Sequence, residues 1–193
     1  MSNKDSDEIA VRPAEAGDFE AFAGILRWSV EEGWANFQTV PSPASELREM
    51  WEMWESRRGL FPYFVGEVGG EVVGAAWSSP WKNKPGYAWT AEVSVYVLPA
   101  GQGRGLARGL YERLFATLKA QGYRLLIAGV ALPNEPSVRL HESFGMVKAA
   151  HFEKNGFKMG AWRDVGYWTL HYEGDDPPAP VRDVSDALGT TGG

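Results

Sequence analysis

The spacing of apolar and polar residues divides the first third of the chain into a strand, two helices and an irregular segment. Residues 9–12 form a short β-rich run that ends at Pro13 and predicts the first strand. Apolar residues at helical spacing follow Asp18 and Ser45, so we expect each of these residues to cap a helix. Residues 33–43 between the helices show no such spacing, and their large aromatic side chains indicate a lid.

The middle of the chain carries the strongest β signals. Two β-rich runs, residues 63–68 and 71–77, are joined by a Gly-Gly pair that is typical of a hairpin. The next run, residues 87–97, alternates apolar and polar positions. We therefore expect a hairpin followed by a strand that is long enough for the centre of a sheet.

A strand–helix–strand unit follows. Leucines recur every fourth residue after Gly103, which predicts a helix that extends to Ala120. The apolar run after it, residues 125–130, is typical of a strand that is buried on both faces in a parallel pair. The pattern is completed by a short helix and two strands, at residues 137–144, 147–152 and 162–172.

Length and composition place these elements in one domain, at residues 9–172. The chain has 193 residues, of which 44% are hydrophobic, enough for one substantial core. Its net charge is −6 and no run of Lys or Arg stands out, which argues against a nucleic-acid or membrane partner and favours a small molecule. The lack of cysteine excludes disulfides, thiolate metal ligands and a cysteine acyl-enzyme, and it is consistent with a cytoplasmic protein.

The two ends of the chain differ from the domain. Residues 1–8 are polar and charged without an apolar segment, so we expect a flexible N-terminus and neither a signal peptide nor a membrane span. Residues 173–193 are rich in Asp, Pro and Gly. They predict a disordered tail, because such a composition buries little apolar surface.

The turn between the central strand and the long helix is rich in glycine and follows a proline. The unpaired N–H groups of the first helical turn, together with the positive end of the helix dipole, are suited to bind phosphate. Gly103 and Gly105 allow the backbone to approach a pyrophosphate closely, while Arg104 and Arg108 add positive charge. The spacing is neither that of a Walker loop nor that of a dinucleotide fingerprint, which disfavours a nucleoside triphosphate.

Glu92 is the unusual residue of the central strand. By alternation it shares one face with Thr90, Ser94 and Tyr96. A carboxylate in the middle of a central strand loses hydration, which raises its pKa toward the range in which it accepts a proton near neutral pH. A cofactor held at the glycine-rich turn would place its reactive end nearby. A solvated polar face or a structural ion pair is the alternative interpretation.

A second group of polar residues follows the second strand of the unit. Asn134, Ser137 and His141 lie near one stripe of the short helix. An imidazole can donate or accept a proton near pH 7, although a single histidine is often structural. His151 and His171 have no metal-ligand spacing relative to it, so we predict no metal.

Together these features resemble the phosphinothricin and methionine sulfoximine N-acetyltransferase branch of the GNAT superfamily. The resemblance spans residues 11–172 and rests on Arg12 with Asp18, Asn36-Phe37, Pro80-Trp81-Lys82, Trp89-Thr90-Ala91-Glu92, Val95-Tyr96-Val97, Gln102-x-x-Gly105, Leu132-Pro133-Asn134, Leu140-His141-Glu142 and Gly160-x-Trp162-x-Asp164-Val165-Gly166. It implies an α/β (α+β) fold in which a central mixed, mostly antiparallel twisted sheet has one splayed parallel strand pair and helices on both faces. It also suggests a homodimer.

The same resemblance implies roles for individual residues. Glu92 is implied to be the general base, and His141, where a tyrosine is common, is implied to protonate the leaving thiolate. The residues implied to hold acetyl-CoA are Val93, Ser94, Val95, Tyr96, Val97, Gln102, Gly103, Arg104, Gly105, Leu106, Ala107, Asn134 and Ser137. The residues implied to border the acceptor amine are Asn36, Phe37, Trp81, Lys82, Thr90 and Arg163.

We therefore expect an enzyme that moves the acetyl group of acetyl-CoA to the amine of a small amino acid-like substrate, by direct attack in a ternary complex. Trp34, Val40 and Arg163 depart from the pattern of the family and indicate a bulkier, less acidic lid, so phosphinothricin itself is expected to be a poor substrate. The alternatives are acetylation of a protein or peptide and a non-catalytic acyl-CoA binding or sensing module.

Overall fold

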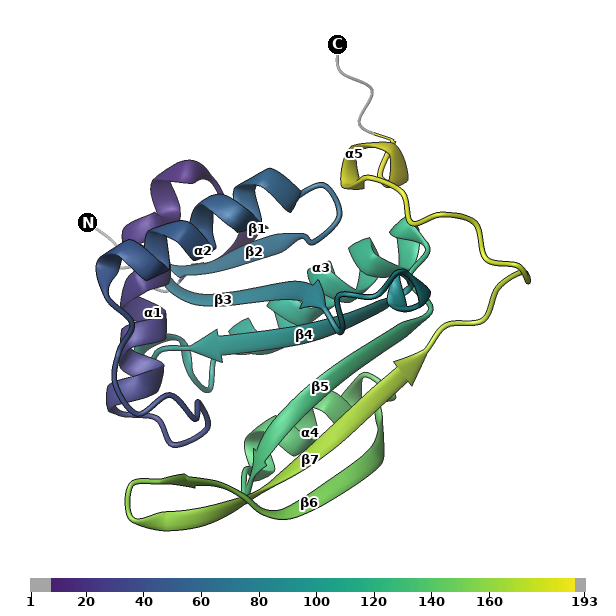
Figure 1. The fold of residues 1–193 in the computed structure, drawn as a ribbon. Coiled ribbons are helices and arrows are strands. Elements are labelled where there is room, and N and C mark those ends of the chain that lie inside the picture. The colour runs from purple at the N-terminus through teal and green to yellow at the C-terminus, as the bar shows by residue number, and fades with distance from the viewer. Residues whose placement is uncertain (1–7, 190–193) are drawn as a thin grey trace.

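The computed structural model describes residues 8–189, in which seven strands form one sheet (Figure 1). The strands are β1 (Ile9–Pro13), β2 (Tyr63–Val68), β3 (Glu71–Pro80), β4 (Thr90–Val97), β5 (Leu125–Leu132), β6 (Val147–Lys158) and β7 (Ala161–His171). Their order across the sheet is β1-β2-β3-β4-β5-β7-β6, and every neighbouring pair is antiparallel except β4 and β5. This architecture confirms the mixed, mostly antiparallel sheet with one parallel pair.

Helices cover both faces of this sheet, as predicted (Figure 1). They are α1 (Phe19–Glu31), α2 (Ala44–Arg57), α3 (Leu106–Gln121), α4 (Glu135–Ser143) and α5 (Val184–Ala187). On one face α1 and α2 pack around Phe22 and Trp51, and on the other face α3 packs through Leu110 and Leu114. The leucines whose spacing predicted α3 are therefore its buried side.

β4 and β5 stay together only over their first residues. Their parallel pairing runs from Thr90 with Leu125 to Glu92 with Ile127 and ends there. β5 then follows β7, with which it pairs along its whole length, while β4 follows β3 (Figure 1). The two strands consequently diverge, and the sheet opens beyond Glu92.

Three predicted starts of elements were wrong. The short helix α4 starts at Glu135 instead of residue 137, because Pro136 is compatible with a first helical turn. The central strand starts at Thr90 instead of residue 87, because Pro85–Tyr87 form a 3-10 turn and proline has no N–H for a strand ladder. Pro43, rather than Ser45, is the N-cap of α2. The restricted φ of proline is compatible with the start of a helix, so the helix begins earlier than its first serine.

β6 and β7 form a long hairpin at one edge of the sheet (Figure 1). β6 extends beyond its predicted end at residue 152, because β7 supplies antiparallel partners as far as the pair of Lys158 with Ala161. Met159 and Gly160 make the turn, with φ of 50° and 72°. The hairpin places the end of β6 close to the segment that follows α1, as described below.

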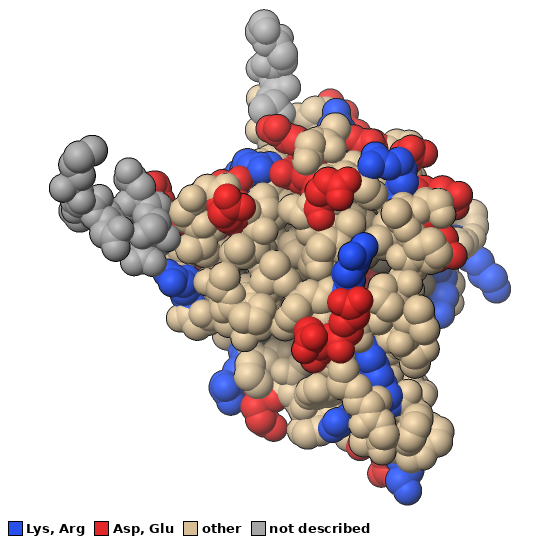
Figure 2. Space-filling view, turned by 90° about the vertical axis from the view of Figure 1, so that its left-hand side faces the viewer, with Lys and Arg blue, Asp and Glu red and all other residues tan. Residues whose placement is uncertain are grey.

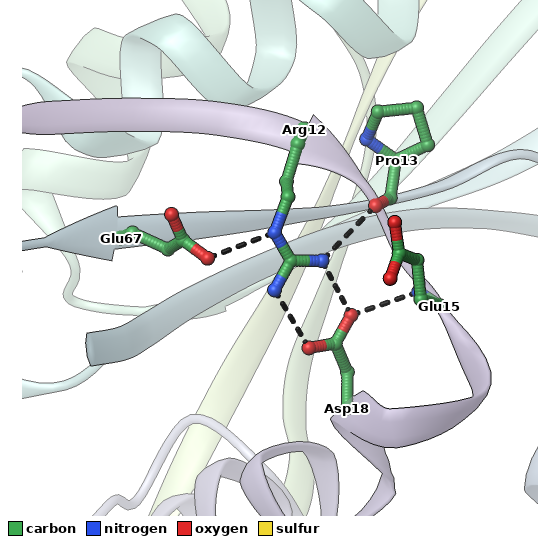
Figure 3. Close-up of polar contacts among 5 residues, drawn as sticks. All are labelled: Arg12, Pro13, Glu15, Asp18 and Glu67. Carbon is green, nitrogen blue, oxygen red and sulfur yellow. Dashed lines mark hydrogen bonds and ion pairs between the residues drawn. The ribbon is translucent and has the colours of Figure 1, made fainter. Parts of the chain in front are cut away.

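Arg12 ties β1 to the start of α1 (Figure 3). Its guanidinium donates hydrogen bonds of 2.7 and 2.8 Å to the Asp18 carboxylate, and its Nε donates one of 2.8 Å to Glu67. The Glu15 N–H also donates to Asp18, at 2.8 Å. The hydrogen bonds from Arg12 hold the pKa of Asp18 below its usual range. Asp18 thus precedes α1 as predicted, but its side chain pairs with Arg12 instead of capping the helix.

The segment after β7, which composition predicts to be a disordered tail, contacts the domain over its described part. Gln121 at the end of α3 is fully buried, and its Nε2 donates hydrogen bonds to the carbonyl oxygens of Gly59, Leu60 and Arg182. α5 follows Arg182 and contacts α3. Residues 1–7 and 190–193, which belong to the two predicted terminal segments, lie outside the described residues.

Charged side chains of both signs are mixed on the face shown in Figure 2, around a broad area of other residues. Among the helices of residues 8–189, none is long and apolar enough to cross a membrane. The same part of the chain contains no group of three or more His, Asp or Glu side chains that could hold a metal ion.

Candidate active site

The opening between β4 and β5 contains a small cavity of about 70 Å³. It is lined by Val93, Ser94, Val95 and Tyr96 of β4, by Gly129, Val130 and Ala131 of β5, and by Ala35, Tyr111, Asn134 and His141. Because β5 no longer pairs with β4 at this point, the edge of β4 presents its backbone to the cavity.

A larger cavity of about 340 Å³ adjoins the first one. The residues that line both are Ala35, Val95, Tyr96 and Asn134. Val97 and Gln102 line only the larger cavity, and the Gln102 Nε2 donates a hydrogen bond of 2.9 Å to the Val97 carbonyl oxygen. The two cavities therefore form one cleft, here called the β4–β5 cleft, which runs from the divergence of the strands to the glycine-rich turn.

The glycine-rich turn lies at the Gln102 end of this cleft. Gly103 and Gly105 have φ of 72° and 82°, in the left-handed region that favours glycine, and Gly105 is the N-cap of α3. The first turn of α3 thus carries the N–H groups that make a helix N-terminus suitable for an anion. Arg104 lies in the glycine-rich turn before the helix, and Ala107 lies in the first turn of α3. Leu106 is 1% exposed and packs in the core, so only its backbone is available to a ligand.

Glu92 lies at the last paired position of β4, where the two strands begin to diverge. Its side chain is half-buried, and this loss of hydration raises its pKa, while the positive charge of Lys82 acts in the opposite direction. A carboxylate with a raised pKa is suited to accept a proton near neutral pH. The structure thus places a potential base at the vertex of the opening.

His141 is buried in α4, and each nitrogen of its ring has a neighbour. Nδ1 lies 2.7 Å from the carbonyl oxygen of Ser137, which can only accept, so Nδ1 carries the proton. Nε2 lies 3.0 Å from the Tyr111 hydroxyl and accepts its hydrogen bond. Burial lowers the pKa of His141, which is therefore neutral at pH 7.

Tyr111 is a residue of the cleft that sequence reasoning missed. It lies among the buried apolar residues of α3, so periodicity assigns it to the core. Its hydroxyl was the available signal, because a buried tyrosine usually needs a hydrogen-bond partner. The partner is His141, 30 residues away in the sequence.

Asn134 and Ser137 shape the start of α4. The Asn134 side chain is the N-cap and accepts a hydrogen bond of 3.3 Å from the Ser137 N–H. The Ser137 carbonyl oxygen in turn orients the ring of His141. The three polar residues predicted to share one stripe are thus connected, and two of them, Asn134 and His141, line the cleft.

Asn36 and Phe37, expected near the acceptor, make contacts within the protein. The Asn36 side-chain amide donates a hydrogen bond of 2.9 Å to the Ser29 hydroxyl of α1. Phe37 packs so closely on Gly156 of β6 that a Cβ atom there would lie 2.2 Å from its ring. These contacts hold the segment between α1 and α2, here called the lid, against both α1 and the β6–β7 hairpin.

Lys158 is a second residue that sequence reasoning missed. Its buried ammonium donates three hydrogen bonds of 2.7 Å, to the carbonyl oxygens of Val30, Gly33 and Asn36. A cation at this position also complements the negative end of the α1 dipole. Because Ala35 of the same segment lines the β4–β5 cleft, Lys158 positions a wall of that cleft from β6.

The other residues expected to border the acceptor lie elsewhere. Lys82 and Thr90 line a separate cavity of about 530 Å³ at the start of β4, and the Lys82 Nζ lies 4.7 Å from the centre of the Trp81 ring. Arg163 lies 4.6 Å over the ring of Trp34 in the lid. The structure therefore does not gather the six expected acceptor residues into one cavity.

The chain is similar to known proteins over most of its length. Residues 27–146 match the acetyltransferase (GNAT) family. A phosphinothricin N-acetyltransferase of Streptomyces viridochromogenes is 39% identical over 92% of this chain and 95% of its own length. An L-methionine sulfoximine/L-methionine sulfone acetyltransferase of Salmonella typhimurium is 34% identical over 89% of this chain and 98% of its own.

A solved structure shows the same fold. The GNAT superfamily phosphinothricin acetyltransferase of Sinorhizobium meliloti, in complex with acetyl-CoA, superimposes with a TM-score of 0.82 at 26% identity, over 90% of this chain and 93% of that one. The family match covers the lid, the glycine-rich turn, Glu92 and α4. The chain therefore belongs to the GNAT family of acetyltransferases.

Proposed function

We propose that the protein transfers the acetyl group of acetyl-CoA to the amine of a small amino acid-like substrate, by direct attack in a ternary complex. The divergence of β4 and β5 carries this proposal, with half-buried Glu92 at one end of the opening and the glycine-rich turn at the other. Glu92 directly precedes Val93, the first residue of β4 that lines the cleft. A base beside this end of the cleft and an anion site at the other end suit a reaction between an amine and a CoA thioester. The names of the relatives support the same chemistry.

The proposal gives the cleft residues the following roles toward the donor. Acetyl-CoA supplies a thioester whose carbonyl carbon is open to attack. Residues 102–107 would bind its pyrophosphate through backbone N–H groups. The exposed edge of β4, residues 93–97, would bind the rest of the arm, and its N–H groups would stabilise the charge that develops on the carbonyl oxygen. Asn134 lines both cavities and would contact the same arm.

Glu92 prepares the acceptor in this scheme. An α-amine is mostly protonated at neutral pH and must lose a proton before its lone pair can attack. Glu92, directly or through a water molecule, takes this proton. The nitrogen–carbon bond then forms and the carbon–sulfur bond breaks, with its electron pair leaving on sulfur. The nitrogen loses a second proton as it becomes an amide, and this proton neutralises the thiolate to give the free thiol. This sequence needs no acyl-enzyme.

His141 acts together with Tyr111. The His141 Nε2 accepts a hydrogen bond, so Tyr111 is the member of the pair that carries the proton at their contact. Burial raises the pKa of Tyr111 well above its usual value, so the hydroxyl keeps its proton and serves as a hydrogen-bond donor. Both residues line the opening. A rotation of the hydroxyl would direct its hydrogen bond to the leaving sulfur.

A thiol-release assay tests the proposal. Protein, acetyl-CoA and methionine sulfoximine are expected to release free thiol. Glu92→Gln is expected to lower the rate about 100-fold, because it removes the general base, while calorimetry shows an unchanged affinity for CoA. Equal turnover by the variant would remove Glu92 from this role. Transfer to peptides alone would favour a protein acetyltransferase, and CoA binding without thiol release would favour a binding or sensing module.

The proposal includes a homodimer in the cytoplasm, as the family resemblance suggests. Light scattering of the purified protein is expected to give twice the mass of one chain, and cell fractionation is expected to recover the protein with the cytoplasmic enzymes. A mass equal to one chain would contradict the dimer without affecting the proposed chemistry.

A further inference from the structure

A separate apolar cavity of about 180 Å³ lies between α2 and the sheet, outside the β4–β5 cleft. Its walls are mostly sulfur-containing and aromatic side chains, from α1, α2, β2 and β3, and they include Phe22, Met50, Met53, Trp54, Tyr63 and Trp77. Met50 and Met53 are 45% and 56% exposed, so α2 presents two flexible apolar side chains to solvent here. We call this space the α2 cavity.

The α2 cavity begins beside Glu92. Ser79 of β3 lines the cavity and is the cross-strand partner of Glu92 in β4. Residues directly opposite in an antiparallel pair point to the same face, with Cβ atoms about 5 Å apart. The carboxylate that accepts the proton of the amine therefore lies at the border of this cavity.

Stacked aromatic rings connect the α2 cavity to the β4–β5 cleft. The ring of Trp77 lies 5.3 Å from that of Tyr63 with an angle of 4° between the planes, and 5.7 Å from that of Tyr96 with an angle of 20°. Tyr63 and Trp77 line the α2 cavity, and Tyr96 lines the cleft. The three rings thus form one continuous apolar surface, on the face of the sheet to which Glu92 also points.

The size and chemistry of the α2 cavity restrict its ligand. An apolar cavity of about 150 Å³ binds benzene, so this one has room for a ring or a branched side chain. Arg57 is the one charged side chain among the described residues of its lining, and it is exposed. The hydroxyl groups of the lining belong to Tyr63, Ser78 and Ser79, and the Tyr63 and Ser78 hydroxyls are buried without a partner. An anionic group placed there would meet hydroxyl groups but no second positive charge, so burying it costs more than burying an apolar group.

We propose that the α2 cavity is the side-chain subsite of the acceptor, and that amino acids with an aromatic or long apolar side chain are acetylated in preference to those with an anionic side chain. The inference rests on the proposed function, and it deepens that function by naming the substrate class. The amine would lie at Glu92 and the side chain would lie over Trp77 under α2. Phosphinothricin, whose side chain ends in a phosphinate, would then be a poor acceptor.

Steady-state kinetics test the preference. L-Phenylalanine and L-leucine are expected to exceed phosphinothricin in kcat/KM by roughly tenfold or more, because burial of each additional methylene in an apolar pocket contributes measurably to discrimination. Met53→Asp is expected to lower kcat/KM for L-phenylalanine about tenfold and to leave glycine within about twofold, since glycine has no side chain to place. Met159→Asp is the matched control, because Met159 is 53% exposed on the β6–β7 turn.

Binding is measured separately on protein labelled with ¹³C in its methionine methyl groups. Addition of L-phenylalanine is expected to shift the signals of Met50 and Met53, while Met146 and Met159 serve as internal controls. Thiol release with methionine sulfoximine, combined with no shift and no preference for apolar acceptors, would overturn the subsite and leave the proposed function intact. Shifts without thiol release from any amine would overturn the proposed function and support the cavity as a binding site.

Discussion

Glu92 illustrates how the surroundings of one side chain determine its chemistry. Burial raises its pKa and the charge of Lys82 lowers it, and burial is the larger effect. The carboxyl group therefore keeps its proton to a higher pH than an exposed glutamate does. The α-amine that it is proposed to deprotonate titrates as well, so both groups contribute to the pH dependence of the reaction.

The raised pKa of Glu92 predicts an acidic limb in the pH profile of kcat. The base form exists only above this pKa, so the rate is expected to fall as the pH falls through it. Glu92→Gln is expected to lose this limb together with most of the rate. Glu71→Gln, which changes an exposed glutamate at the start of β3, is the control and is expected to keep the profile. An unchanged acidic limb in Glu92→Gln would assign the limb to another group.

At the scale of elements, the structure depends on how helices and strands end. α3 begins at a glycine in the left-handed region, and α1 ends at carbonyl groups that a lysine from β6 satisfies. Both ends border the β4–β5 cleft. The proposed binding of acetyl-CoA therefore depends on local backbone geometry at the start of α3 and on a tertiary contact, made by Lys158, at the end of α1.

Gly105→Ala is predicted to weaken CoA binding by changing the start of α3. Gly105 has a φ of 82°, which costs an L-residue about 1–2 kcal/mol. The turn is expected to relax away from this conformation, and the Kd for CoA measured by calorimetry is expected to rise about tenfold. Gly24→Ala in α1 is the control, because its Cβ would meet nothing within 4 Å and its φ is not positive. An unchanged Kd in Gly105→Ala would show that the turn does not bind the cofactor.

Lys158→Met is predicted to loosen the lid. It leaves the carbonyl groups of Val30, Gly33 and Asn36 without their donor, which is expected to lower the free energy of unfolding by about 1–3 kcal/mol in urea titrations. The Kd for CoA, measured by calorimetry, is expected to rise, because Ala35 of the lid lines the β4–β5 cleft that is proposed to hold the cofactor. Lys148→Met, at an exposed lysine of the same strand, is the control. Equal effects of the two substitutions would contradict a positioning role for Lys158.

At the scale of the whole molecule, the cleft exists because β5 pairs fully with β7 and only briefly with β4. The sheet divides at this point into two halves, and α3 and α4 join them through contacts such as that of Tyr111 with His141. The segment after β7 adds a further connection, from α3 to the end of α2 through Gln121, Gly59 and Arg182.

Removal of residues 174–193 is predicted to lower the Tm. The deletion takes away the Arg182 carbonyl group that accepts from buried Gln121, a loss of about 1–3 kcal/mol, and each kcal/mol corresponds to about 2–4 °C for a domain of this size. Differential scanning calorimetry measures the shift. A chain that lacks only residues 190–193 is the control and is expected to keep its Tm. An equal Tm for both deletions would show that the tail does not stabilise the domain.

The sequence by itself determined the features that depend on local spacing. The leucine repeat of α3, the glycine-rich turn, the hairpin between β2 and β3 and the face of Glu92 all follow from periodicity and backbone preference over a few residues. The motifs also indicated the family, because they recur at fixed positions along nearly the whole chain. Starts of elements next to proline were predicted wrongly, as Pro43 and Pro85 show, because proline restricts its own backbone and that of the residue before it.

Only the tertiary structure decided how these elements meet. The contact of Tyr111 with His141 joins residues 30 apart, and that of Lys158 with Val30 joins residues 128 apart. The α2 cavity likewise depends on α2 lying over β3, next to Glu92. The spacing of apolar residues predicts which side of an element is buried. The element that packs on that side is determined by packing and hydrogen-bond satisfaction over the whole molecule.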